Sequence, residues 1–322
     1  MNKIYSILSA EQINRADEFF RIGSSYNSDM LRRLLDEWGV IAPLIVSRHG
    51  ESYRIVEGFD RFDCAVLHGI TELPVIEVDT DEFSCYRFAI FNAVMQNSCD
   101  IFDIAQVLAV LSDYFLVPRQ DIATEYLPFF GFSCRDKILD KLITIHKFDP
   151  SQKKLCRDEC IETDKILLIS DIDRTIRNDM IELMIELRPS INKVKQIIEL
   201  IDEISGREGK PPAEVLSDPL LRSILDDEAC NAGQKLNRFR EALYVRRNPA
   251  LSCTLELVDR KIRQLKLDNR IKLIVPPYLE GDQLRLEAEF ENKEQLEEIA
   301  RNLLQTAGLK SFGELLDIIK EP

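Results

Sequence analysis

Hydrophobic positions in the first part of the chain switch between helical and strand spacing. Apolar residues recur with helical spacing over 30–38, and the strand-like segments APLIVSR and YRIVE follow. The turn sequence HGES between these two segments predicts an antiparallel hairpin. FDRFDCAVLHG (59–69) and DEFSCYRFAIFNAVMQN (81–97) then read as helices on either side of the strand LPVIEVD. This alternation predicts a compact α/β domain over residues 1–97.

The spacing becomes helical throughout residues 98–206. PRQDIATEYL (118–127) is followed by the turn GFS, and Ser133 is placed to cap the next helix, CRDKILDKLITIHKF (134–148). A short helix, a turn with glycine and a second helix with polar residues at its start are typical of a helix-turn-helix. We therefore expect an all-helical middle domain that contains this motif.

Residues 207–322 follow a third pattern. GREGKPPAEVLSDP (206–219) holds two glycines and three prolines, the clearest loop signal of the chain. Two helices, two alternating strands and a closing helix come next, at 232–247, 251–267, 270–275, 283–291 and 292–308. The last three form a small ββα unit whose strands are joined by PPYLEGD (276–282). The chain as a whole is predicted to be α+β.

Composition argues against a membrane protein and against a metal site. No run of about 18 apolar residues exists, although 45% of the 322 residues are hydrophobic. The N-terminal segment lacks the basic stretch and apolar block of a secretion signal. The eight cysteines are scattered and the three histidines lie far apart, whereas zinc needs clustered ligands. We expect a cytoplasmic protein with reduced cysteines and no metal site.

Charge is segregated along the chain. The net charge of −14 disfavours nucleic acid on average. Residues 232–272 nevertheless hold eleven Lys or Arg against four Asp or Glu, a balance of +7, whereas residues 273–322 hold five against eleven, a balance of −6. Five basic residues of this block are singled out: Lys235, Arg238, Arg240, Arg246 and Arg247. They could contact DNA phosphates or pair with the acidic C-terminal unit.

The sequence VEGFDRFD (56–63) joins a predicted strand to a predicted helix. Gly58 lets a ligand approach the backbone, and the helix N-terminus that follows offers free N–H groups to an anion. Arg61 in the first helical turn can add a bidentate guanidinium to phosphate oxygens. The plainer interpretation is a tight strand-to-helix turn with a solvated arginine, and Asp60 as a helix-start dipole partner.

At these positions the sequence resembles the N-terminal domain of ParB-type partition proteins, a fold shared with sulfiredoxin. The family pattern is Gly-x-x-x-Pro-hydrophobic-Val, then Tyr-x-Ile-Val-x-Gly-Glu-Arg-Arg-x-x-Ala-Ala, then Gly-x-x-x-hydrophobic-Pro-Val. The matching positions are Gly39, Pro43, Val56, Gly58, Arg61, Ala65, Gly69, Pro74 and Val75. The likeness continues more generically through the predicted helix-turn-helix and the closing ββα segment, which is similar to a ParB dimerisation unit.

The resemblance implies a CTP site with magnesium in the first domain. Its nucleotide- or phosphate-binding positions are Gly58, Phe59, Asp60 and Arg61. Asp60 stands where the family has an arginine, and Ala93-Val94 stand where it has a Glu-Asn pair. At about 5 Å from a phosphate and an effective dielectric of about 20, each unit charge contributes roughly 3 kcal/mol of interaction energy before solvent and salt screen it. The substitution therefore argues against CTP hydrolysis, and no catalytic residue is assigned.

The helix-turn-helix supplies candidate DNA contacts. From Ser133 to Arg157 there are seven basic and three acidic residues, a balance of +4. A recognition helix turns its N-terminal residues to base edges. The predicted DNA-binding residues are Ser133, Arg135, Lys137, Lys141 and Lys147. The alternative is a solvated face on a helical bundle.

The leading hypothesis is a ParB-like, multi-domain DNA-binding protein that acts in replicon partition or transcription regulation and is modulated by a nucleotide. The resemblance implies a homodimer, with a partition ATPase or another protein as a further partner. One alternative is a protein-interaction scaffold that binds neither DNA nor nucleotide. Another is a nucleotide-dependent phosphotransferase that uses Glu57, Asp60 and Arg61.

Overall fold

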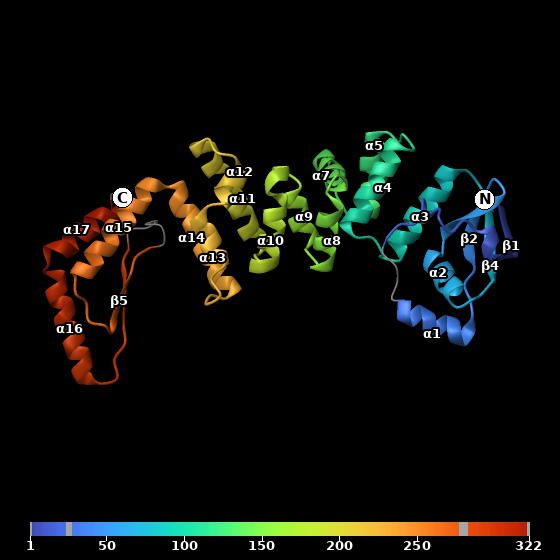
Figure 1. Ribbon diagram of the computed structural model, residues 1–322. Coiled ribbons are helices and arrows are strands. Elements are labelled where there is room, and N and C mark those ends of the chain that lie inside the picture. The colour runs from blue at the N-terminus through green and yellow to red at the C-terminus, as the bar shows by residue number, and fades with distance from the viewer. Residues whose placement is uncertain (1, 24–27, 277–282, 321–322) are drawn as a thin grey trace. The chain divides into compact units, whose positions relative to one another are not determined.

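The chain forms two compact units, Met1–Ile172 and Asp173–Pro322. The computed structural model describes residues 2–23, 28–276 and 283–320 (Figure 1). Helices dominate both units and each unit holds one small sheet, so the predicted α+β class is confirmed. The finer division into 1–97, 98–206 and 207–322 stays a prediction.

The first unit is built on a four-stranded sheet with strand order β1-β4-β2-β3. Its strands are β1 (Asn2–Ser9), β2 (Leu44–His49), β3 (Ser52–Glu57) and β4 (Glu72–Asp79). The predicted hairpin is confirmed, because β2 and β3 pair antiparallel, while β4 runs parallel to β2. The N-terminal strand β1 pairs antiparallel to β4 and was not expected from the sequence.

Three helices accompany this sheet: α1 (Ser28–Trp38), α2 (Phe59–Leu67) and α3 (Glu82–Met95). The apolar side of α2 buries Phe62 and Ala65 in one core cluster with Leu44, Val46 and Val75 of the strands. Burial of each large apolar side chain of this kind contributes about 1.5–3 kcal/mol. This packing fixes the start of α2 against the end of β3, where the candidate phosphate turn lies.

Short helices complete the first unit. They are α4 (Ile101–Asp113), α5 (Arg119–Asp121), η2 (Ile122–Tyr126), α6 (Leu127–Phe129), α7 (Asp136–His146), α8 (Pro150–Asp158) and α9 (Thr163–Ile169). The segment from α5 to α6 and then α7 matches the predicted short helix, turn and second helix. The predicted cap is wrong, because α7 begins after Arg135 and not after Ser133. Residues 133–135 instead close a turn in which the Arg135 N–H donates to the Ser133 carbonyl at 2.7 Å.

The second unit begins with a helical array. Its elements are η3 (Arg174–Ile176), α10 (Arg177–Leu187), α11 (Ile191–Glu208), α12 (Pro212–Leu216), α13 (Pro219–Leu225) and α14 (Ala232–Arg247). The loop predicted over 206–219 is wrong for most of its length. Pro212 and Pro219 each open a helix, at a position where the missing proline N–H has no helical partner anyway.

The C-terminal part of this unit contains α15 (Pro249–Gln264), β5 (Ile271–Ile274), β6 (Arg285–Ala288), α16 (Lys293–Ala307) and α17 (Lys310–Lys320). β5 and β6 pair antiparallel and α16 follows them, so the predicted ββα order is confirmed. In the predicted connection PPYLEGD, residues 277–282 lie outside the described residues. The last helix, α17, was not expected, and it packs on α15 through Leu315 and Ile319.

Candidate functional site

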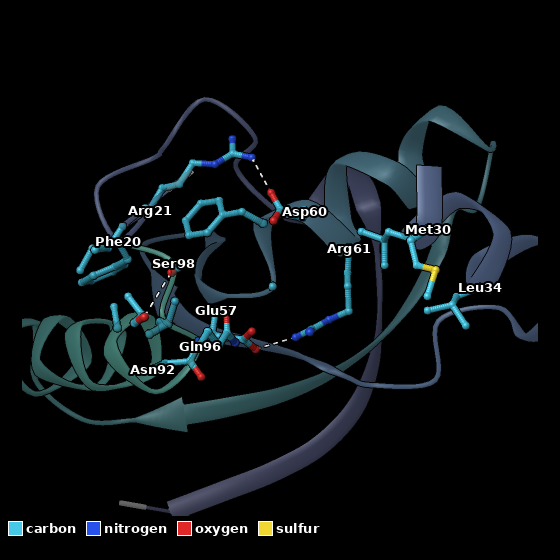
Figure 2. A pocket seen from close by; sticks show the side chains of 18 residues that line it. Phe20, Arg21, Met30, Leu34, Glu57, Asp60, Arg61, Asn92, Gln96 and Ser98 are labelled. Carbon is cyan, nitrogen blue, oxygen red and sulfur yellow. Dashed lines mark hydrogen bonds and ion pairs between the residues drawn. The ribbon is translucent and has the colours of Figure 1, made fainter. Parts of the chain in front are cut away.

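A cavity of about 530 Å³ lies in the first unit where β3 ends and α2 begins (Figure 2). A volume of this size suits a small molecule. Gly58, Phe59, Asp60 and Arg61 all line it, so the structure brings the four predicted residues together around one space. Further walls come from the segment after β1, from α1 and from α3.

Gly58 is the pivot of the turn. Its φ of +101° lies in the left-handed region, and it directly precedes the first residue of α2. A Cβ at this position would meet Leu44 Cδ2 at 2.7 Å and Arg61 Nη2 at 2.8 Å. Only glycine fits such a site without displacing a core side chain or the guanidinium. The glycine therefore keeps the backbone close to the Arg61 head group.

Arg61 is bound by a carboxylate of its own chain. Its Nη2 donates to Glu57 Oε2 at 2.5 Å and to the Pro43 carbonyl at 3.4 Å. The side chains of Arg61 and Glu57 are only 24% and 14% exposed. Figure 2 shows the Arg61 side chain directed at Glu57. The arginine expected to be solvated or to face a ligand is thus neutralised at the end of β3.

Asp60 faces a different cation, which comes from the segment after β1. Arg21 Nη2 lies 3.2 Å from Asp60 Oδ1 (Figure 2). It also lies 2.8 Å from Asp63 Oδ2, and Arg21 Nη1 lies 2.6 Å from Glu18. The Arg21 guanidinium also lies 5.3 Å from the centre of the Phe59 ring. Asp60 therefore helps to tie the N-terminal segment to the start of α2.

The charges around the cavity do not suit a polyphosphate with magnesium. Of the charged side chains that line the cavity, two are carboxylates and two are guanidinium groups, so no positive excess is left for a polyanion. Magnesium is held through carboxylates and phosphate oxygens, but Glu57 and Asp60 are bound to arginines. Among the described residues no group of three His, Cys, Asp or Glu is arranged to hold a metal ion.

Several cavity residues were missed from the sequence. Arg21 is separated from Asp60 by 39 residues, and no local pattern connects them. Asn92 of α3, Gln96 at the C-cap of α3, and Met30 and Leu34 of α1 also line the cavity. The spacing of Asn92 and Gln96, i and i+4 on one helix face, was the one signal that could have indicated them.

A second surface is formed by α7. Leu139, Leu142 and Ile145 are at most 1% exposed and form its inner face, and the helix packs on α4. The opposite side and the residues before the helix face solvent: Ser133, Arg135, Lys137 and Lys147 are exposed. In the described part of the chain, Arg135, Lys137 and Lys147 have no hydrogen-bond or ion-pair partner for their side chains.

Lys141 differs from the other predicted DNA-binding residues. It is half-buried, its ammonium lies 2.6 Å from Asp171, and it donates to the Leu167 carbonyl at 3.1 Å. It connects α7 to the end of α9, and its charge is neutralised by Asp171.

The basic residues of α14 are used in the same way. Lys235 pairs with Glu186 at 2.7 Å, and Arg247 pairs with Glu203 at 2.7 Å. The other three also bind residues outside α14: Arg238 binds Asp227, Arg240 binds Gln196, and Arg246 binds Glu208 and Asp218. These partners all lie between residues 186 and 227. Within the described residues, α14 therefore does not pair with the acidic C-terminal segment, which was one of its two possible roles.

Comparison with known proteins gives the family context. One relative is the probable chromosome-partitioning protein ParB of Borreliella burgdorferi, 44% identical over 54 residues that cover 17% of this chain and 20% of the relative. Another is the probable plasmid-partitioning protein ParB of Thermus thermophilus, 30% identical over 88 residues that cover 27% of this chain and 30% of the relative. Over these stretches the chain is similar to ParB partition proteins.

The matched stretches span less than a third of either curated relative. No family model matches the chain. Among solved structures, the C-terminally truncated ParB from Caulobacter crescentus complexed to the centromeric parS site is 14% identical, with a TM-score of 0.40 over 60% of this chain and 98% of that one.

No helix of the described chain is long and apolar enough to span a bilayer.

Proposed function

We propose that this ParB-like chain binds duplex DNA through α7 and acts in replicon partition. The observation that carries the proposal is the N-terminal end of α7, where Arg135 and Lys137 are exposed and have no intramolecular partner within the described residues. A helix held by its apolar face and open at a basic N-terminus has the geometry of a recognition helix. Transcription regulation would use the same surface, and partition is preferred because both curated relatives carry that name.

Ser133, Arg135, Lys137 and Lys147 are the proposed DNA contacts. Ser133 and Arg135 precede the helix and are suited to base edges, whereas the lysines suit phosphates as point charges. Lys141 has the smallest expected contribution of the five, because its ammonium group is bound to Asp171.

Fluorescence polarisation with labelled duplex DNA tests the proposal at about 50 mM and about 200 mM salt. We expect binding that weakens with salt, and a loss of about tenfold or more in affinity for Arg135→Ala. Lys195→Ala is the matched control, because Lys195 is exposed on α11 and its replacement removes the same charge from the second unit. Absence of binding at the lower salt concentration would contradict the proposal and favour an interaction scaffold.

A homodimer formed by the C-terminal ββα segment belongs to the same proposal. β6 is exposed at every residue, and an apolar cavity of about 250 Å³ lies among leucines of β5, β6 and α16. A hairpin of two strands is marginal alone, and burial of this face against a second copy would stabilise it. A partition ATPase or another protein is a further partner of the proposed assembly.

Nucleotide modulation at the cavity beside Gly58 is a separate question, because the ion pair between Glu57 and Arg61 opposes a polyphosphate there. Calorimetric titration with CTP and magnesium tests this part separately from DNA binding. Heat of binding that disappears in Arg61→Ala supports a nucleotide switch. A flat titration removes the nucleotide from the proposal, together with the phosphotransferase alternative, and leaves DNA binding by α7 untouched.

A further inference from the structure

Glu57 is the residue that decides which charges the cavity accepts. A phosphate group approaching this turn would bind the guanidinium of Arg61, since that group is the cation nearest to Gly58. The Glu57 carboxylate already lies 2.5 Å from that guanidinium. Because Glu57 is 14% exposed, its charge is poorly screened by water. An incoming phosphate must therefore displace a partly buried carboxylate or lie beside it.

The second cation of the cavity cannot take over this role. Arg21 is surrounded by Glu18, Asp60 and Asp63 at 2.6, 3.2 and 2.8 Å. Arg15 Nε also lies 3.9 Å from Asp63, so three carboxylates and two guanidinium groups form this cluster and no positive excess remains. Both arginines that line the cavity are thus neutralised by side chains of the same unit.

We propose that Glu57 is a specificity-determining residue that excludes polyphosphates by occupying Arg61, and that the wild-type cavity takes a ligand with little or no negative charge. Asn92 and Gln96 offer amide groups to such a ligand, and Met30 and Leu34 offer apolar surface. The sequence alone pointed to Asp60 as the residue that disfavours a triphosphate. The structure assigns that role to Glu57, because Asp60 is bound to Arg21.

Removal of the Glu57 charge should create affinity for phosphate groups, whereas most substitutions in a binding cavity weaken binding. Glu57→Gln keeps the shape of the side chain and removes its charge, which releases Arg61 for a phosphate. Inorganic triphosphate is the probe, because it reports on the turn without any contribution from a base. By calorimetry we expect Glu57→Gln to bind it about tenfold to a hundredfold more tightly than the wild type.

Two matched variants define the control. Asp60→Asn removes the same charge from the same cavity but acts on Arg21, and Glu72→Gln removes it at the exposed start of β4. Both should stay within about threefold of the wild type. Adding Arg61→Ala to Glu57→Gln should abolish the gain.

The proposal is overturned if the wild type binds triphosphate as tightly as Glu57→Gln, or if neither binds at about 1 mM. It is also overturned if Asp60→Asn gains as much as Glu57→Gln, or if the gain survives the loss of Arg61. Should Glu57→Gln be weakly folded, its thermal midpoint is measured with and without triphosphate. A rise confined to that variant supports the proposal, and no rise contradicts it. DNA binding by α7 is measured separately and does not decide this outcome.

Discussion

At the scale of single residues, the turn beside the cavity depends on one glycine more than on its charged neighbours. Gly58 combines a left-handed backbone with a site where an added Cβ would come within 3 Å of Leu44 and Arg61. Either property alone is common in proteins. Because Gly58 has both properties, a side chain added there would change the strand-to-helix turn and also the position of the Arg61 guanidinium.

Gly58→Ala should therefore lower the free energy of unfolding of the first unit by about 3 kcal/mol, the sum of a left-handed alanine and an overpacked contact. Gly50→Ala is the control, because Gly50 also has positive φ, +64°, but has nothing within 4 Å of an added Cβ. It should cost only about 1–2 kcal/mol. Calorimetric unfolding measures both, and equal costs would show that the contacts with Leu44 and Arg61 are unimportant.

At the scale of elements, the start of α4 is joined to α8 by a partly buried charge cluster. Arg157 of α8 lies 2.5 Å from Asp100 and 2.8 Å from Asp103. Asp100 caps α4 by accepting from the N–H groups of Phe102 and Asp103. Burial, with a contribution from the neighbouring Asp100 carboxylate, raises the pKa of Asp103 to about 6. The cluster is therefore sensitive to pH close to neutrality.

Asp103→Asn should change how stability depends on pH. Because the folded-state pKa lies above the unfolded value, the folded state binds more protons between about pH 4 and pH 6. Its free energy of unfolding therefore falls as pH rises through this window. The asparagine side chain of the variant cannot titrate, so the stability of the variant relative to wild type should increase by about 1 kcal/mol from about pH 5 to about pH 7.5.

Thermal or urea unfolding at the two pH values measures this difference. Asp158→Asn, which removes an exposed carboxylate from α8, is the control and should leave the difference near zero. A constant offset between Asp103→Asn and wild type across the pH range would show that Asp103 titrates normally.

At the scale of the whole molecule, the C-terminal segment exposes apolar side chains that suit assembly into a dimer. The exposed side of the C-terminal segment includes Leu286 of β6 and Leu304 of α16, which are 47% and 75% exposed and line the same apolar cavity. Leucines that border an apolar cavity and still face solvent are typical of an interface.

Leu304→Glu should convert the proposed dimer to a monomer of 37.2 kDa, because a charge would be buried in the interface. Light scattering at micromolar concentration measures the mass. Leu220→Glu places the same charge on α13, where Leu220 is 60% exposed and outside that cavity, and should leave the dimer intact. A wild-type protein that is already monomeric would refute the dimer.

The sequence by itself determined the order of most elements and the frame of the phosphate turn. Helical and strand spacing are local properties, so the β2–β3 hairpin, α14 and the ββα segment were predicted close to their observed positions. Gly58 and Arg61 were recognisable because a strand end, a glycine and a first-turn arginine lie within a few residues. The loop predicted over 206–219 was wrong because Pro212 and Pro219 each begin a helix, and sequence alone does not separate this role of proline from its role in loops.

Only the tertiary structure decided which charges are free. Arg21 pairs with Asp60 across 39 residues, Lys141 pairs with Asp171, and the basic residues of α14 bind carboxylates and one amide outside their own helix. An ion pair depends on distances of a few ångströms between side chains, and spacing along the chain does not contain these distances. For that reason the sequence indicated an anion site and two basic surfaces. Of those two surfaces, the described residues leave the one at the start of α7 available.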